Sequence, residues 1–172
     1  MAAAKLKTLG GKPAFLGYQG FPDVICISIN DEVVHGIPRK DRVIDDGDIV
    51  SLDFGVSVNG MITDAAISVV AGTTENHKVT ELLKTTELSL HKGIEQLKGG
   101  VKVGTVAAAI EAVLNKHHYG VVKDLVGHGV GHHVHEEPNI PNYGRVGTGP
   151  VLHSGMTIAI EPMATLGREE VT

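Results

Sequence analysis

Four acids and histidines of this chain have the types and the surroundings of metal ligands. Asp53 and Asp64 lie in apolar segments, LDFG and ITDAA. His128 lies in GHGVGHHVHEEP, and Glu161 follows the apolar run TIAI. A carboxylate among apolar neighbours is costly to bury unless a cation meets it. Divalent metal ions would meet all four side chains at once, which would allow metal-assisted hydrolysis.

The two aspartates are predicted to share one face of a β-hairpin. Asn59-Gly60 is typical of a two-residue hairpin loop, and this loop would make Asp53 and Asp64 diagonal neighbours on one sheet face. Two alternatives stay open: both carboxylates are solvated, or a slip of one residue separates them onto opposite faces. The other face of the first strand is expected to be core and carries Val50, Leu52, Phe54, Val56 and Val58.

The other two ligand candidates also have simpler interpretations. His128 is the best of the histidines in its segment because glycines on both sides let the backbone bend towards an ion, whereas His132 and His133 are expected to be structural or exposed. Glu161 would otherwise form a salt bridge to Arg or Lys. His35, in VVHGIP, is expected in a loop, either simply exposed or able to hydrogen-bond a substrate and move a proton.

The segments that must position these residues predict an α+β protein. Short β-branched runs indicate strands, and apolar residues at spacings of three and four indicate helices. We expect an antiparallel sheet with the helices packed on one face. The expected strands cover 24–29, 45–58 after an initial turn, 61–70, 121–126 and 157–163, and the expected helices cover 77–98 and 106–118, the second with Thr105 as its N-cap.

Length and composition indicate one soluble domain over residues 1–172, with 42% hydrophobic residues. The net charge of −5 and the lack of a basic stripe argue against a nucleic-acid partner. Cys26 is the single cysteine, so an internal disulfide and a Cys-based zinc site are excluded. No apolar run reaches transmembrane length, so we expect a cytoplasmic protein with no membrane partner.

Taken together, these segments resemble the methionine aminopeptidases of the bacterial type, which have the pita-bread fold. The resemblance implies a metallo-exopeptidase, a hydrolase that removes the initiator Met from nascent proteins, with the ribosome as a partner. Its substrate would be a peptide or nascent N-terminus that starts with Met. The similarity covers about residues 13–170 and is carried by LGYQGFPDVICISIN, EVVHGIP, DGDIVSLDFG, DAAISVV, GHGVGHHVHEEP and SGMTIAIEPM.

The resemblance also assigns metal ligands by position. It implies that Asp53 binds one metal and that Asp64 bridges two. His128 and Glu161 would be the further ligands. One or two ions of Co, Mn, Fe or Zn would be held, and a water activated by them would attack the first peptide bond.

Five positions are implied to meet the substrate. His35 and His135 would contact the substrate near its amino end and scissile amide and would take part in catalysis. Tyr18, Phe21 and Cys26 would line the pocket for the methionine side chain, whose thioether suits a small apolar slot.

The chain departs from the family pattern at its ends. It resembles a form truncated at both ends and incomplete at the C-terminus, because the family continues to strands that carry a last ligand glutamate. Glu169 and Glu170 are expected to be solvated. We therefore expect weak or single-metal occupancy, reduced activity and an open sheet edge that a partner chain or a dimer covers.

Two alternative functions remain beside the aminopeptidase. One is a catalytically weak or inactive pita-bread module that binds peptides without chemistry, which the missing glutamate favours. The other is a peptidase of the Xaa-Pro class, which shares the fold and the ligands. The VVHGIP segment favours the aminopeptidase over the Xaa-Pro enzymes.

Overall fold

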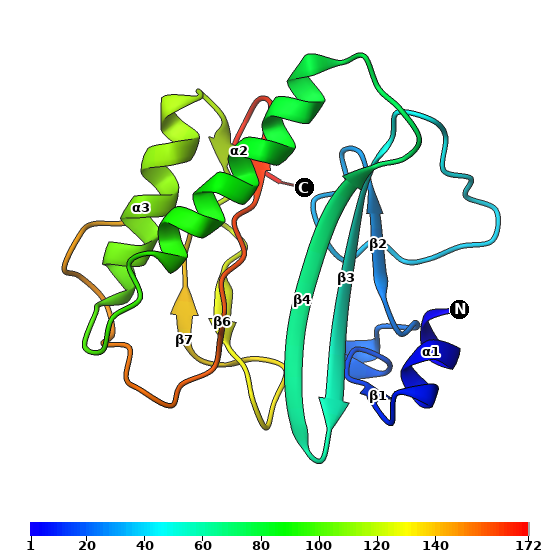
Figure 1. Cartoon of the computed structure of the whole chain (residues 1–172), viewed down its shortest axis with the longest axis horizontal. Helices are drawn as coiled ribbons and strands as arrows, with labels where there is room; N and C mark the ends of the chain where they lie inside the picture. Colours follow the sequence, from blue (N-terminus) through cyan, green and yellow to red (C-terminus); the bar gives the residue numbers. More distant parts are fainter. Residues whose placement is uncertain (172) are drawn as a thin grey trace. The chain divides into compact units, whose positions relative to one another are not determined.

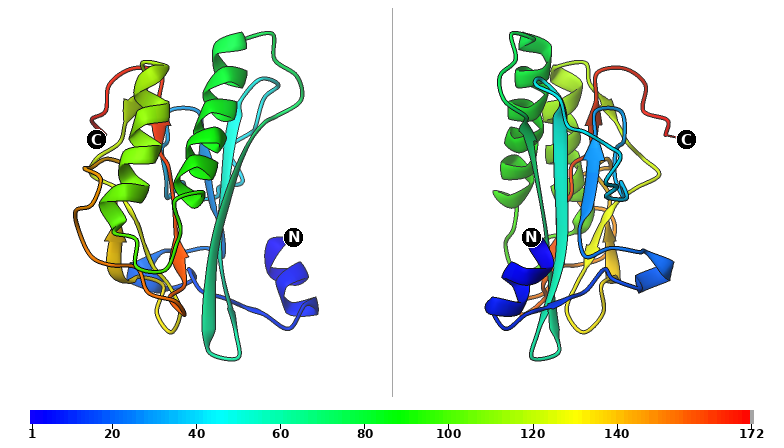
Figure 2. Two further views of the ribbon diagram at one scale, coloured as in Figure 1. Left: turned by 60° about the vertical axis from the view of Figure 1, so that its left-hand side comes forward. Right: turned by 90° about the vertical axis from the view of Figure 1, so that its right-hand side faces the viewer.

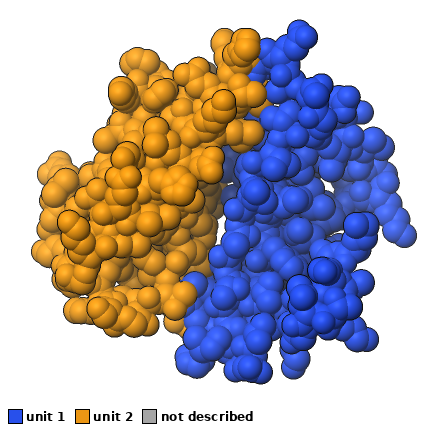
Figure 3. All heavy atoms as spheres, viewed as in Figure 1, with its two compact units in different colours: residues 1–76, 130–135 blue, residues 77–129, 136–172 orange. Residues whose placement is uncertain are grey.

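The computed structural model describes residues 1–171, whose contacts group into two compact units (Figure 3). Unit 1 comprises Met1–Asn76 and Val130–His135, and unit 2 comprises His77–Gly129 and Glu136–Thr172. The prediction of one domain over residues 1–172 stays a prediction, because a grouping by contacts does not establish which part folds alone.

Unit 1 is built on a four-stranded antiparallel sheet around the long hairpin of β3 and β4, which run side by side (Figures 1 and 2). β4 pairs with β3 over its whole length, while β2 and β1 pair with successive parts of β3. A short helix, α1, and a 3₁₀ turn, η1, complete the unit. The elements are α1 Ala2–Thr8, β1 Lys12–Pro13, η1 Tyr18–Gly20, β2 Cys26–Ile29, β3 Ile49–Val58 and β4 Met61–Val70.

The hairpin has the predicted loop and register. Val58 pairs with Met61 around Asn59 and Gly60, whose φ angles of 52° and 83° are the positive values that a tight hairpin turn requires. The predicted core face is only partly correct, because Val50 is buried whereas Val58 is 46% exposed. Val58 is exposed because it lies at the hairpin tip, one residue beyond the last pairing with β1.

The core of unit 1 gathers residues that are distant in sequence. Phe15, Cys26 and Val134 are buried together, with Tyr18 and Phe21 packed against them. The segment 130–135 is held to the sheet because the main-chain N–H of Ile62 on β4 donates to the carbonyl of Gly131 (2.6 Å). The apolar cluster therefore joins three parts of the chain on one sheet.

Unit 2 combines two packed helices with short antiparallel strands (Figure 1). In its three-stranded sheet, β6 lies between β7 and β8. A separate two-stranded sheet pairs β5 with β9. None of the helices within residues 1–171 has the length and apolar character to cross a bilayer. The elements are α2 His77–Ile94, α3 Val103–Lys116, β5 Gly120–Val121, β6 Gly127–Gly129, β7 Glu136–Ile140, β8 Ile158–Ala159 and β9 Ala164–Thr165.

The core of unit 2 is the buried stripe of α3. Its members recur at spacings of three and four, as expected for one helix face. Gly93 of α2 lies against Ile110, where a Cβ would come within 2.9 Å of the isoleucine side chain, so the glycine lets the helices approach closely. The buried residues of this core are Val103, Val106, Ile110, Leu114, Val121, Ile140 and Leu152.

The predicted helices and antiparallel strands are present, but several boundaries were wrong. α3 begins before the predicted cap Thr105, because the first amides of the helix, Val103 and Gly104, donate to the carbonyls of Pro150 and Thr148. The predicted 121–126 strand reduces to the end of β5, and the predicted 157–163 strand reduces to β8, with β9 beginning just after its range. Pro162, which has no N–H for a ladder, lies between those two strands.

The hairpin turn yields a test of stability. Gly60→Ala forces an alanine to φ 83° with no atom within 4 Å of the new Cβ, so the change is purely conformational. We expect the free energy of unfolding in urea to fall by about 1–2 kcal/mol. Gly167→Ala is the matched control, because its Cβ also meets no atom within 4 Å but its φ lies outside the left-handed region. Equal stabilities of the two variants would contradict the assigned turn.

Candidate functional site

Unit 1 presents two aspartates on one sheet face. Asp53 pairs with Ala66 and Asp64 pairs with Gly55, so both carboxylates project from the same side of the hairpin, as the loop predicted. Both aspartates are partly buried. Cys26 on β2 is the direct cross-strand partner of Asp53 and shares this face. The register therefore excludes the one-residue slip.

A glycine lets an aromatic ring pack between these groups. Gly55 lies two residues from Asp53 and directly opposite Asp64. A Cβ at Gly55 would overlap the ring of Phe15, so the ring rests on the bare backbone of β3. The aspartates are consequently bordered by an apolar surface on their own sheet.

The residues predicted to line a substrate pocket lie in one cluster of unit 1. Tyr18, Phe21 and Cys26 pack together with Phe15 and Val134. The Tyr18 hydroxyl lies 2.8 Å from Nδ1 of His135, and the centroids of the two rings are 5.4 Å apart. The structure thus places His135 beside the pocket residues, and the hydrogen bond at Nδ1 orients its ring.

The Cys26 thiol is kept neutral by its surroundings. Burial raises its pKa to about 12, and the negative charges of Asp53 and Asp64 add to the shift. The sulfur is free of any disulfide. At neutral pH it acts as a small apolar side chain at the edge of the cluster.

His35 is in a loop, as predicted, and is exposed in a constrained conformation. Its φ of 59° is unusual for a residue with a side chain. The next residue, Gly36, is buried against β2, where a Cβ would overlap the carbonyl of Ile27. The N–H of Gly36 donates to Oγ of Ser28 (3.0 Å), and its carbonyl accepts from Ile27 (2.8 Å). The anchored glycine holds His35 in place.

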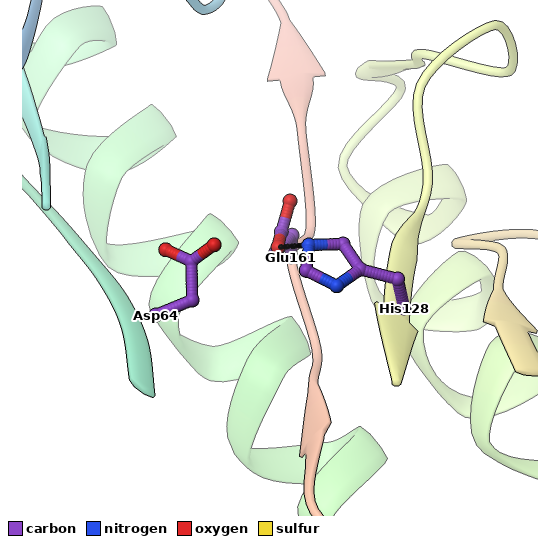
Figure 4. A group of neighbouring side chains, drawn as sticks. All are labelled: Asp64, His128 and Glu161. Atoms are coloured by element: carbon purple, nitrogen blue, oxygen red, sulfur yellow. Dashed lines mark ion pairs between the residues drawn. The ribbon is translucent and has the colours of Figure 1, made fainter. Parts of the chain in front are cut away.

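Unit 2 contains a buried histidine that faces a carboxylate. Nε2 of His128 on β6 lies 3.1 Å from Oε1 of Glu161, and Figure 4 draws the two side chains and marks this ion pair. His128 is 4% exposed. The ion pair of Glu161 is thus with a histidine and not with an Arg or Lys, contrary to the simpler interpretation of its sequence context.

The hydrogen bond at Nδ1 of His128 determines which charge must lie between Nε2 and the Glu161 carboxylate. Nδ1 of His128 lies 2.8 Å from the carbonyl of Gly129, and a carbonyl can only accept, so Nδ1 carries the proton. In the neutral ring, Nε2 then directs a lone pair at a carboxylate oxygen of Glu161. A positive charge must separate them, either a second proton or a metal ion. A backbone carbonyl behind the imidazole is typical of metal-binding histidines.

The glycines around His128 make this arrangement sterically possible. A Cβ at Gly127 would overlap the carbonyl of Ala159, and one at Gly129 would overlap the carbonyl of Glu137. Both glycines therefore let β6 fit between its two neighbouring strands. The predicted bend of this segment towards an ion stays a prediction.

Most of the remaining expectations agree with the structure, and one residue was missed. Glu169 and Glu170 are exposed, as expected, and Glu169 forms a surface ion pair with Nζ of Lys123 (2.8 Å). His132 and His133 are exposed, as expected. Asn142 was missed: it is fully buried, and its Nδ2 donates to the main-chain carbonyl of Glu161 (2.7 Å). An asparagine two residues after a strand is an ordinary turn signal, so the sequence alone would not have singled it out.

Comparisons with known proteins identify similar chains. The profile of metallopeptidase family M24 matches residues 1–170. A methionine aminopeptidase of Treponema pallidum is 49% identical over 167 residues, which are 96% of this chain and 64% of that protein. Methionine aminopeptidase 1 of Bacillus subtilis is 43% identical over 166 residues, covering 96% and 66%. The chain thus spans slightly less than two thirds of the length of these curated relatives.

Solved structures show the same similarity. A methionine aminopeptidase from Thermotoga maritima matches with a TM-score of 0.94 and 45% identity, covering 97% of this chain and 67% of that one. A prolidase from Pyrococcus furiosus matches with a TM-score of 0.70 and 26% identity, covering 84% and 42%. Both fold and sequence are therefore more similar to the aminopeptidase than to the prolidase.

The anchoring of His35 can be tested through Ser28. Ser28→Ala removes the acceptor of the Gly36 N–H, so the amide exchange of Gly36 should accelerate about threefold to tenfold, as expected for one hydrogen bond. Exchange is followed by NMR. Ser51→Ala is the control, since Ser51 Oγ pairs instead with Ser68 (2.6 Å). Unchanged exchange at Gly36 in the Ser28 variant would show that this bond does not hold the loop.

The environment of Cys26 predicts a pH profile. With a pKa near 12, the Cys26 thiol of the metal-free protein remains mostly protonated at pH 9–10. The rate of alkylation by iodoacetamide should therefore still increase with pH in this range, because the reacting thiolate becomes more abundant. In the urea-unfolded protein the alkylation rate should level off once the pH exceeds about 8.5, the usual pKa of a free thiol. Asp53→Asn should lower the native pKa, because one repelling charge is removed. A native profile that levels off near pH 9 would refute the assigned environment.

Proposed function

The chain belongs to metallopeptidase family M24, and from this membership we propose that it acts as a metal-dependent methionine aminopeptidase. It would hydrolyse the first peptide bond of a polypeptide that begins with Met. The pita-bread fold predicted from the sequence is confirmed by the structural match to methionine aminopeptidases. The observation that carries the proposal is Nε2 of His128 facing the Glu161 carboxylate with Nδ1 already committed to a carbonyl.

The proposal assigns Asp53, Asp64, His128 and Glu161 as metal ligands. Support comes from each unit separately: the hairpin places two carboxylates on one face, and unit 2 opposes an imidazole lone pair to a third carboxylate. Such oxygen and nitrogen donors suit Mn, Fe, Co or Zn. When bound, the ion supplies Lewis acidity, which polarises a carbonyl and lowers the pKa of water.

The remaining site residues are proposed to bind and orient the substrate. The Tyr18 hydroxyl lies against Nδ1 of His135 and orients the ring, which we propose hydrogen-bonds the substrate amide. His35 projects from its anchored turn and would contact the same end of the peptide. The Phe21 ring and the neutral Cys26 thiol offer an apolar wall with no charge, which suits the thioether of methionine.

Partners and compartment form a finer part of the proposal. The proposed substrates are nascent chains that begin with Met and emerge from the ribosome. The proposed compartment is the cytoplasm, where a free cysteine such as Cys26 stays reduced. On the edge strand β4, Ile67 is 60% exposed and Val69 is 40% exposed. An open edge strand with exposed apolar side chains can pair with another chain, so we propose that a partner chain or a second copy covers it.

Two other functions are less well supported. A binding module without chemistry has no need of a buried imidazole opposed to a carboxylate, which is costly to maintain without a cation. An Xaa-Pro peptidase would share the ligands, but the chain is more similar to the aminopeptidases than to the prolidases in sequence and fold.

Activity on a short peptide tests the proposal. The metal-free protein should not hydrolyse Met-Ala-Ser, and addition of Co²⁺, Mn²⁺, Fe²⁺ or Zn²⁺ should start the release of free Met. Asp64→Ala should lower kcat/KM by more than about 100-fold, because it removes a ligand rather than an outer-shell contact. Asp31→Ala is the control, since it removes an exposed carboxylate of the same unit.

The outcomes separate the functions. Absence of Met release with every metal contradicts the aminopeptidase. If calorimetry then shows metal binding at micromolar concentration, the binding module is favoured, and if it shows none, the metal centre fails as well. Preferential cleavage of Xaa-Pro peptides over Met-Ala-Ser would instead indicate the prolidase class.

A further inference from the structure

Asn142 occupies an unusual place in unit 2. It follows β7 by two residues, is fully buried and lies outside the proposed set of ligands. Its Nδ2 donates a 2.7 Å hydrogen bond to the main-chain carbonyl of Glu161. The side chain therefore contacts the backbone of a proposed ligand rather than its carboxylate.

The strand order explains what this contact does. β6 lies between β7 and β8, with Gly127 paired to Ile140 and His128 paired to Ala159. β6 begins at Gly127, and the chain continues past the last residues of β7 and β8, Ile140 and Ala159, to Asn142 and Glu161. The Asn142 amide joins the two outer segments where the central strand no longer pairs with them.

The backbone at Glu161 has little other regular support. β8 extends over Ile158–Ala159 only, and Pro162 has no N–H to donate. The Glu161 side chain is 31% exposed, so packing alone does not confine it. The Asn142 bond is therefore well placed to fix the direction in which the Glu161 carboxylate leaves the main chain.

Stability does not account for an asparagine at this position. Its Oδ1 is buried and accepts no hydrogen bond from the described residues. A buried acceptor left unpaired costs about 1–3 kcal/mol, and an apolar side chain of similar volume would avoid this. A local feature that lowers stability in this way is expected at functional sites.

We propose that Asn142 is a positioning residue of the metal centre: it holds the Glu161 backbone so that the carboxylate stays opposed to Nε2 of His128. This inference rests on the proposed function, because it assigns Glu161 as a ligand. Asn142 itself touches neither metal nor substrate. Its effect is transmitted through the main-chain carbonyl of Glu161.

The test uses Asn142→Leu, which removes the amide and keeps the branched shape of the side chain, with Asn139→Leu as the control. Asn139 is an exposed asparagine of β7 three residues earlier. Titration calorimetry with Mn²⁺ alone should show an affinity about 10- to 100-fold weaker for Asn142→Leu, as for other outer-shell contacts, and an unchanged affinity for the control. Urea unfolding checks that the variant folds: Asn142→Leu relieves the unpaired Oδ1 but removes the donor to the Glu161 carbonyl, so its free energy of unfolding should change by no more than about 1–3 kcal/mol.

A second readout needs no metal. In the metal-free protein, hydrogen exchange by mass spectrometry should accelerate over residues 158–163 in Asn142→Leu and not in Asn139→Leu. If Asn142→Leu does not fold, Asn142→Ala is used for both measurements, since it removes the amide without adding bulk. Loss of stability with unchanged exchange and unchanged Mn²⁺ affinity would show that the role is only structural and would overturn the proposal.

Failure of this inference is distinguishable from failure of the proposed function. Equal Mn²⁺ affinity and exchange in the wild type and the folded Asn142 variant overturn the positioning role alone. A wild type that binds Mn²⁺ but releases no Met overturns the aminopeptidase, while a weakened affinity in the variant still supports positioning. A wild type that binds no Mn²⁺ overturns the metal centre and this role within it.

Discussion

The structure depends most on the opposition of a buried imidazole to a carboxylate. Nδ1 of His128 is committed to the carbonyl of Gly129, so its other nitrogen meets Glu161 with a lone pair unless a positive charge intervenes. Few uncharged arrangements would be stable there, because two acceptors at 3.1 Å repel. A metal ion at this position is the premise of the proposed hydrolytic function and of the role of Asn142; a second proton is the alternative.

Close backbone approach recurs wherever a functional side chain is placed. Gly127 lets β8 lie against β6 at Ala159, Gly36 seats the turn that presents His35, and Gly55 admits an aromatic ring beside the aspartates. In each case the residue next to or opposite the glycine is one of the proposed site residues. The high glycine content, 22 of 172 residues, thus has a specific structural use at these three positions.

Features that depend on neighbouring residues could be predicted from the sequence, whereas features that depend on residues distant in sequence could not. The hairpin register was predictable because Asn59-Gly60 determines it locally, and it placed Asp53 and Asp64 on one face. The start of α3 was not, because its first amides donate to carbonyls over forty residues away, at Thr148 and Pro150. Asn142 was missed for the same reason, since its partner Glu161 lies 19 residues away in the sequence.

The most direct measurement is anomalous diffraction from crystals of this protein soaked in Mn²⁺ or Zn²⁺. A metal ion held by this pair should give a peak within about 2.0–2.2 Å of both Nε2 of His128 and a carboxylate oxygen of Glu161, the usual length of such bonds. Soaked crystals with no peak at this position, and with the imidazole still in contact with the carboxylate at 3.1 Å, would contradict this prediction. The positive charge between them would then be a proton, and the pair would be an ordinary buried ion pair.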